Sequence, residues 1–333
     1  MSIPGNPVHL SLATDDYDHI RDLAAGLVRA EGIEITHLRL SVEEIFYRFT
    51  AYGEWEVSEY SFAKYVSRRA QGDNSITAIP VFPSRVFRLS SIYVRDDDQI
   101  TSLQDLSGRR VGVPEWSVTA GVYARGYLQH EAGVALSEID WVQAGMNEPG
   151  REEKASLSLP DGLRYSQVGD RSLTEMLLAG DIDAMIVPRP PAHFASGQPG
   201  IRRLFADFRS AEEAHYRKSG IFPIMHTIAI RSAVLERHPW IAVNLMNAFE
   251  EAKRRSLARA LDATMSHYPV PWGFDDAARA QALFGADIWP YGIEANRPTL
   301  EAFLQYAHEQ GLAPNLLAVE DLFPASVQRT HVV

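Results

Sequence analysis

The order of strand-like and helix-like patterns near the N-terminus constrains the fold more than any other feature of the sequence. A buried strand followed by a loop at 8–16, and further strands at 33–40 and 76–83, alternate with amphipathic helix patterns at 19–30 and 42–52. Another strand and helix, WEVSEYS and FAKYVSRRA, complete the alternation. Strands separated by helices pair in parallel and are covered by those helices. The sequence therefore predicts an α/β fold.

A second unit of the same kind begins at LSGRRVGVP, residues 106–114. Further strands are predicted at 138–145 and 183–188, and a helix at 172–180. The charged stretch 146–162, rich in Pro and Gly, is expected to be a loop or a β-excursion. The chain is therefore expected to contain two α/β units.

The stretch 220–234 is predicted to be extended, and two extended segments, 87–95 and 222–231, stand on either side of the second unit. The simplest topology is two lobes joined by two crossing strands, with residues 1–92 plus 227–333 in lobe I and 93–226 in lobe II. Ligands of open α/β sheets bind beyond the carboxyl ends of the strands. We therefore expect a ligand cleft where two such edges face one another.

Charge and composition restrict the possible partners. A net charge of −11 argues against nucleic acid or an anionic membrane surface. Because the chain has no cysteine, disulfides, thiolate metal sites and a cysteine nucleophile are excluded. No apolar run reaches the roughly 18 residues of a membrane span, and the N-terminus lacks a secretory-signal pattern. We therefore expect a cytoplasmic protein.

Several long stretches carry a family likeness. LSGRRVGVPEWSVTA, LAGDIDAMIVP and the crossing segments resemble the type 2 periplasmic-binding-protein-like fold, in which each lobe is a mixed sheet flanked by helices. AIPVFPSRVFRLSSIYV, GIFPIMHTIAIR, EPGREEK and WPYGIEANRPTLEAFLQYAHEQGL resemble 4,5-dihydroxyphthalate decarboxylases. The resemblance implies a carboxy-lyase that converts 4,5-dihydroxyphthalate to protocatechuate and CO2. It also implies a small aromatic carboxylate as partner and no organic cofactor.

Candidate groups for binding such a dianion lie at the expected strand ends. Ser117 and Thr119, at the start of a predicted helix, can offer hydroxyl and N–H donors to a carboxylate, or can simply cap the helix. Arg85 and Arg88 can bind carboxylates or form surface ion pairs. Residues three apart in an extended segment point to opposite faces, so only one of these two is expected to face the cleft. Arg189, in a Pro-flanked loop, is a third candidate clamp.

Candidate catalytic groups are two histidines and one glutamate. His226, in a crossing segment, is predicted to be the proton donor, with a buried structural histidine as the alternative. Glu59 or His19 is the expected base partner, unless Glu59 is a solvated loop acid and His19 caps a helix. Tyr17 could stack on an aromatic ligand. A divalent metal between the histidines is conceivable, but no tightly spaced histidine pair occurs, so no metal site is predicted.

Two other functions remain open from the sequence. The first is a non-catalytic cytoplasmic binding or sensor protein for an aromatic or small organic anion. The second keeps the decarboxylase but changes its substrate to another hydroxylated benzene carboxylate. The aromatic-rich C-terminal stretch suits either a core or a subunit interface, so a homo-oligomer is also possible.

Overall fold

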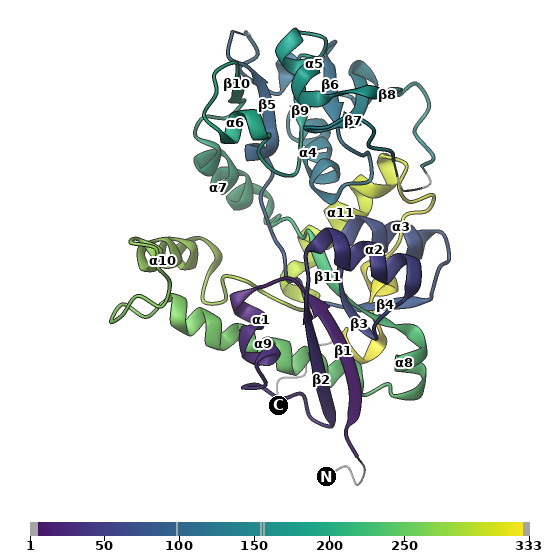
Figure 1. Cartoon of the computed structure of the whole chain (residues 1–333), viewed down its shortest axis with the longest axis vertical. Helices are drawn as coiled ribbons and strands as arrows, with labels where there is room; N and C mark the ends of the chain where they lie inside the picture. Colours follow the sequence, from purple (N-terminus) through teal and green to yellow (C-terminus); the bar gives the residue numbers. More distant parts are fainter. Residues whose placement is uncertain (1–5, 98, 154, 156, 329–333) are drawn as a thin grey trace.

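The computed structural model describes residues 6–97, 99–153, 155 and 157–328. These residues form two α/β lobes, one above the other in Figure 1. The sheet of the lower lobe has the order β2-β1-β3-β11-β4. Its strands are β1 Val8–Thr14, β2 Ile33–Arg39, β3 Val57–Ser61, β4 Ile76–Ile79 and β11 His226–Arg231.

The sheet of the upper lobe has the order β10-β5-β9-β6-β7-β8. Its strands are β5 Ile92–Arg95, β6 Arg110–Val113, β7 Asp140–Gly145, β8 Arg164–Ser172, β9 Ala184–Ile186 and β10 Ile201–Arg203. Both sheets are mixed, because β11 runs antiparallel to β3 and β4, and β5 runs antiparallel to β9 and β10. The predicted α/β class and its mixed sheets are thus confirmed. The residue boundaries of the two lobes stay a prediction.

Helices flank both sheets (Figure 1). They are α1 Asp18–Ala24, α2 Val42–Tyr52, α3 Phe62–Ala70, α4 Thr119–His130, α5 Leu173–Ala179, α6 Ala192–Ala195, α7 Phe208–Ser219, α8 Ser232–Arg237, α9 Ile241–Ala260, α10 Gly273–Phe284 and α11 Arg297–Glu309. Short 3₁₀ turns lie at Leu89–Ser91, Gln104–Leu106, Leu136–Glu138, Glu294–Asn296, Val319–Leu322 and Ala325–Val327. Among the helices of the described residues, none has both the length and the apolar character needed to cross a bilayer.

Local sequence explains where several helices begin and end. The Ser41 hydroxyl accepts the N–H of Glu44 at the start of α2, and Gly53 closes that helix with φ of 55°. Ser172 and Glu175 form a reciprocal capping box at the start of α5. The helix predicted at 19–30 ends earlier, at Ala24, because Gly26 turns the chain with φ of 71°.

The second crossing segment pairs with the residues just before the first. Arg85 and Ile224 form an antiparallel bridge, and the N–H of Met225 donates to the carbonyl of Ser84 at 2.9 Å. The chain then enters β11 at His226. The connection between the sheets is therefore a two-stranded junction rather than two independent linkers.

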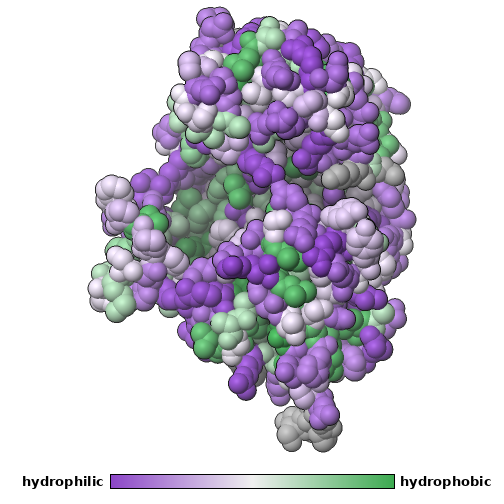
Figure 2. Space-filling view, in the orientation of Figure 1, coloured by the Kyte–Doolittle hydropathy of each residue, from purple (hydrophilic) through white to green (hydrophobic). Residues whose placement is uncertain are grey.

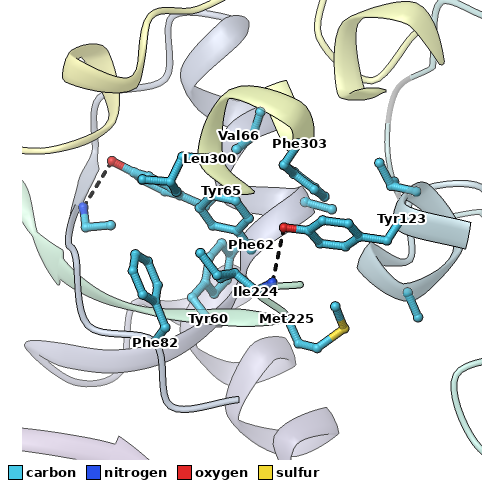
Figure 3. Close-up of a cluster of buried hydrophobic side chains, with 14 of the residues drawn as sticks. Tyr60, Phe62, Tyr65, Val66, Phe82, Tyr123, Ile224, Met225, Leu300 and Phe303 are labelled. Carbon is cyan, nitrogen blue, oxygen red and sulfur yellow. Dashed lines mark hydrogen bonds between the residues drawn. The ribbon is translucent and has the colours of Figure 1, made fainter. Parts of the chain in front are cut away.

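The lobes are also fused on one side by a shared core. Helix α11 packs against α3 of the lower lobe and α4 of the upper lobe. In Figure 3 the rings of Phe62, Phe303 and Tyr123 lie together, and the centroids of Tyr123 and Phe303 are 4.9 Å apart. Buried Gln310 accepts the indole N–H of Trp116 through its carbonyl at 2.7 Å. This packed core closes one side of the junction between the lobes.

Two elements differ from the expectations, and a third agrees with them. Strand β8 was not predicted, because most of its residues are exposed and polar and it lacks an apolar pattern. The extended segment expected to run through 232–234 is wrong there, since α8 begins at Ser232. The stretch 146–162 contains no helix or strand among its described residues, which agrees with a loop.

Candidate active site

The polar residues at the cleft-facing edge of the lower sheet come from strands that the fold brings together. Strands β1 and β3 run in parallel, so they end at the same edge, and antiparallel β11 begins there. His226, the first residue of β11, lies opposite Ser61, the last residue of β3. The chain after β1 leads directly to Tyr17 and His19 at the start of α1. The sequence-predicted catalytic residues are therefore neighbours in the fold.

Glu59 is the centre of this group. Its side chain is fully buried, and its Oε1 accepts the Tyr17 hydroxyl at 2.6 Å and lies 2.5 Å from His226 Nδ1. Its Oε2 accepts the backbone N–H of Asp15 at 2.9 Å. Burial alone would raise the pKa of Glu59, but the hydrogen bond and charge of His226, with the other donors, hold it below its ordinary value. Glu59 is therefore a buried carboxylate that stays ionised.

His226 has one nitrogen engaged and part of its ring exposed. A carboxylate can only accept, so Nδ1 carries the proton that points to Glu59, and Nε2 is the nitrogen left for other work. The ring edge packs against Phe46 of α2, with centroids 5.0 Å apart. The side chain is 18% exposed, in contrast to the fully buried Glu59. This arrangement orients a histidine for proton transfer, with the glutamate behind it.

Tyr17 donates a hydrogen bond to Glu59 in this structure. Burial and the negative charge of Glu59 raise the pKa of the Tyr17 hydroxyl far above its ordinary range, so the hydroxyl remains a donor. The Tyr17 ring lies 5.3 Å from the ring of His19. The expected stacking of Tyr17 on an aromatic ligand stays a prediction.

His19 is held neutral between two aromatic rings. Its ring centroid lies 5.3 Å from that of Tyr17 and 5.4 Å from that of Trp289. Burial lowers the pKa of His19 to about 4. Among the described residues, its buried Nε2 has no hydrogen-bond partner. A neutral imidazole with a free nitrogen can accept a proton from a ligand hydroxyl, although its low pKa makes it a weak base.

The two arginines of PSRVFR have different surroundings. Arg85 is buried, with Nη1 donating to the carbonyl of Pro290 at 3.0 Å and Nη2 to that of Phe222 at 2.7 Å. Its guanidinium lies 4.2 Å from the centroid of the Phe222 ring, and burial lowers its pKa to about 10. Arg85 thus fastens backbone segments together, and the expected carboxylate contact has no support in this geometry.

Arg88 lies between the edges of the two sheets. Its Nη1 donates to the carbonyl of Pro188, just after β9, at 2.8 Å. Its Nε lies 3.1 Å from the sulfur of Met225, the residue before His226. Among the described residues, its Nη2 makes no hydrogen bond. Arg88 thus contacts the chain next to β9 and the residue before β11, and its predicted contact with a substrate carboxylate stays a prediction.

Arg189 lies at the rim of the cleft rather than inside it. Its guanidinium pairs with Glu43 of α2 at 2.5 Å, and the two side chains are 61% and 58% exposed. This pair links the upper lobe to the lower. Burial would raise the pKa of Glu43, but its own N–H and the charges of Arg189 and Arg151 lower it. Arg189 is therefore an exposed cation whose charge is paired with Glu43.

The helix start at Ser117 and Thr119 is occupied by residues of the chain itself. The Glu153 carboxylate accepts the N–H groups of Trp116 and Ser117 at 2.5 and 3.2 Å and the Ser117 hydroxyl at 2.5 Å. Thr119 Oγ1 accepts the N–H of Ala63 at 3.2 Å and so ties α4 to α3. The Ser117 donors thus hold an internal carboxylate, and Thr119 acts as an acceptor for a neighbouring helix; their binding of a substrate carboxylate stays a prediction.

Sequence reasoning assigned no role to Phe46 or Trp289, and it expected Asp15 only to favour the dipole of the helix that follows. Trp289 lies in the WPYG stretch that supported the family likeness, and its indole N–H donates to the carbonyl of Phe82 at 2.9 Å. That stretch was the only available signal for Trp289. Asp15 contacts Glu59 through its backbone N–H, and the type of side chain does not predict such a contact.

A hollow opens between the lobes on the side away from the shared core. Figure 2 shows it in the region between α7 and α10, with hydrophobic residues in its depth and polar ones around its entrance. An aromatic row of Phe284, Phe222 and Trp289 joins α10 to His19, with centroids 4.7 and 5.6 Å apart along the row. Within the described residues, no three His, Cys, Asp or Glu side chains gather to hold a metal.

Sequence comparison identifies relatives of this chain. No family model matches the chain. The chain is 38% identical over 323 residues to the 4,5-dihydroxyphthalate decarboxylase of Comamonas testosteroni, covering 96% of this chain and 98% of that protein. It is also 38% identical over 213 residues to the 4,5-dihydroxyphthalate decarboxylase of Pseudomonas putida, covering 64% of this chain and 83% of the relative.

Solved structures of low sequence identity share the fold. The periplasmic aliphatic sulphonate binding protein SsuA of Escherichia coli matches with a TM-score of 0.55 at 14% identity, covering 97% of this chain and 99% of that chain. The desulfurization enzyme DszB in complex with biphenyl-2-sulfinic acid matches with a TM-score of 0.51 at 15% identity, covering 95% and 96%. These matches support the type 2 periplasmic-binding-protein-like fold. On its sequence identity and coverage, the chain belongs to the 4,5-dihydroxyphthalate decarboxylase family.

Proposed function

We propose that this protein is a carboxy-lyase that removes CO2 from a hydroxylated benzene dicarboxylate without an oxidant, with 4,5-dihydroxyphthalate as the first candidate. The observation that carries the proposal is the pairing of buried Glu59 with partly exposed His226 at 2.5 Å. A histidine whose second nitrogen is free and whose first is fixed by a carboxylate is suited to proton transfer. The named activity of the two relatives supports the same assignment.

The chemistry requires one proton to reach a ring carbon. In 4,5-dihydroxyphthalate each carboxylate is para to a hydroxyl, so removing the phenolic proton pushes electron density toward the carbon that bears the carboxylate. A proton added to that carbon interrupts the aromatic system. The carbon–carboxylate bond then breaks, its electron pair returns to the ring, and CO2 leaves. Returning a proton to the phenolate completes protocatechuate.

We assign the proton transfer to the ring carbon to His226. Its Nε2 is the nitrogen not occupied by Glu59, and the negative charge of Glu59 stabilises the imidazolium form. Glu59 itself is fully buried, so its role is to orient and charge-stabilise His226 rather than to touch the substrate. Free Nε2 of His19 is the available acceptor for a phenolic hydroxyl. This proposal revises the sequence-based assignment, in which Glu59 or His19 was the base.

Binding of the carboxylates is assigned to Arg88, with Arg189 at the entrance. Arg88 is anchored beside Met225 and Pro188, so a carboxylate that it binds lies close to His226. In a chain of net charge −11, the exposed Arg189 gives a dianion a local positive target. Nothing in the proposed steps requires an organic cofactor or a metal.

The direct test incubates purified, metal-stripped protein with 4,5-dihydroxyphthalate and follows protocatechuate and CO2. The expected result is one CO2 per protocatechuate formed. Ligand-dependent thermal stabilisation without turnover would instead indicate a binding or sensor protein. Turnover of a different hydroxybenzoate, with none of the phthalate, would keep the carboxy-lyase and change its substrate.

A further inference from the structure

A buried lysine lies behind the candidate active site. Lys253 of α9 is 1% exposed, and its Nζ pairs with Asp287 at 2.6 Å and with Glu250 at 2.8 Å. The same ammonium lies 4.7 Å from the centroid of the Tyr291 ring. Lysine is almost never fully buried unless it is paired, and burying its charge costs desolvation energy that an apolar residue would avoid. A charged side chain at this position therefore calls for a specific reason.

The lysine connects to the active site through Asp287 and Trp289. While Oδ2 of Asp287 binds the ammonium, its Oδ1 accepts the backbone N–H of Trp289 at 3.1 Å. The other end of Trp289 is fixed by its indole N–H, which donates to the carbonyl of Phe82. The indole therefore has a defined position, and its ring centroid lies 5.4 Å from that of His19.

The same face of α9 supports the other side of His19. Ser256 and Arg259 follow Lys253 at spacings of three, so each side chain neighbours the next along the helix surface. The Ser256 hydroxyl donates to Asp18 Oδ2 at 2.6 Å, and Arg259 Nη2 donates to the same oxygen at 3.1 Å. Asp18 stands between Tyr17 and His19 in the chain. Polar side chains of α9 thus hold both Asp287, next to Trp289, and Asp18, next to His19.

We propose that Lys253 is a positioning residue for the reaction site, which through Asp287 sets the Trp289 indole against His19. The inference rests on the proposed function, because it assigns His19 a contact with substrate. Lys253 itself does not contact the substrate. A merely structural ion pair would contribute to folding stability and leave the rate of chemistry unchanged once the protein is folded.

The test compares Lys253→Met with Arg254→Met on the same helix. Arg254 is 67% exposed and pairs only with Glu251 among the described residues, so it controls for the loss of a cation from α9. With 4,5-dihydroxyphthalate as substrate, Lys253→Met is expected to lower kcat on the order of 10- to 100-fold, because small displacements of reacting groups cost that much. KM is expected to change by less than about threefold, and Arg254→Met to leave both constants unchanged.

A double-mutant cycle with Trp289→Phe tests whether the effect passes through the indole. If it does, Lys253→Met adds little to the loss already caused by Trp289→Phe. Additive losses, or an unchanged kcat in a less stable Lys253→Met protein, would overturn the proposal. Asp287→Asn, at a side chain that is 44% exposed, tests the same connection if Lys253→Met does not fold.

A second measurement without substrate separates this inference from the proposed function. Hydrogen exchange of the Trp289 indole N–H, assigned by its absence in Trp289→Phe, reports on the position of the ring alone. We expect faster exchange in Lys253→Met or Asp287→Asn and no change in Arg254→Met. If the wild-type protein shows no turnover but the indole N–H still exchanges faster in Lys253→Met, the proposed function is wrong and the positioning stands. Unchanged exchange would sink the positioning.

Discussion

The two sheet edges that face the cleft both carry polar residues, but they use them differently. At the edge of the lower sheet, Glu59, His226 and Tyr17 form a buried network with one partly exposed nitrogen-bearing ring. At the edge of the upper sheet, the donors around Ser117 are satisfied by Glu153, and Arg189 extends to the surface. The comparison suggests that the lower lobe supplies the chemistry and the upper lobe supplies enclosure and charge.

The largest effect is expected at the lower edge, from Glu59→Gln. Loss of the negative charge behind His226 should lower kcat by about 10²- to 10⁴-fold, the range of a positioned acid–base group. His226→Gln should have an effect of similar size. Steady-state kinetics on 4,5-dihydroxyphthalate measures both.

Glu56→Gln is the matched control for Glu59→Gln. Glu56 precedes β3 and also accepts donors of β1, namely the N–H and hydroxyl of Ser11, but it has no histidine partner in the structure. The same substitution there should leave kcat unchanged. Wild-type turnover by Glu59→Gln would remove the buried pair from the chemistry.

The next effect concerns pH and the stability of the lower lobe. The folded-state pKa of His19 is about 4, against 6.5 when the ring is free, so the unfolded chain takes up a proton first as the pH falls. The stability that neutral His19 contributes is therefore present above pH 6.5 and lost between pH 6.5 and 4. The loss amounts to at most about 3 kcal/mol, from 1.4 kcal/mol per pKa unit.

Urea unfolding of wild type and His19→Asn at pH 7 and pH 5 isolates this contribution. The free energy of unfolding of the wild type should fall more steeply with decreasing pH than that of the variant. His37 and His215, whose pKa values burial also lowers, are present in both proteins and cancel in the difference. If the free energy of unfolding changes equally with pH in the two proteins, protonation of His19 does not contribute to the pH dependence between pH 7 and pH 5.

Much of this fold was predictable because its signals are local. The alternating patterns of the N-terminal region, the helix at 42–52 with its Ser41 cap, and the extended crossing segments depend on neighbours in the sequence. His226, Glu59 and His19 meet at one edge of the lower sheet, because parallel β1 and β3 end there, antiparallel β11 begins there, and the chain after β1 leads into α1.

The partners of the predicted binding residues could not be predicted, because they lie far away in the sequence. Arg85 is enclosed by carbonyls of Phe222 and Pro290, far away in the sequence, and Ser117 is bound by Glu153 from a loop without regular structure. The spacing of Arg85 and Arg88 predicted that their side chains would diverge, but it could not say which of them is buried.

The third effect separates these two arginines. Arg88→Met should lower kcat/KM by about 10- to 100-fold, because a charge-assisted contact to a substrate carboxylate is lost. Arg85→Met should instead lower the free energy of unfolding by about 2 kcal/mol or more, since two buried carbonyls lose their donors. Kinetics and chemical denaturation of both variants give the contrast. A kinetic loss confined to Arg85→Met would reverse the assignment.

The fourth effect tests the upper edge. Glu153→Gln should lower the free energy of unfolding by about 1–2 kcal/mol, because the amide accepts from Trp116 and Ser117 more weakly than the carboxylate. Glu152→Gln, at the exposed neighbouring position, is the control and should leave stability unchanged. Tighter substrate binding by Glu153→Gln would show instead that Glu153 competes with the substrate for this helix start.

The smallest effect is expected from Arg189→Ala at the rim. An exposed ion pair contributes at most about 1 kcal/mol, so the loss of the Glu43 contact should hardly change stability. If Arg189 only attracts the dianion, KM should rise a few-fold at low salt and approach the wild-type value as salt screens the charge. Arg217→Ala, which removes an equally exposed arginine from α7, controls for the overall charge. A salt-independent loss of kcat would move Arg189 from the entrance into the reaction site and would give the upper edge a share of the chemistry.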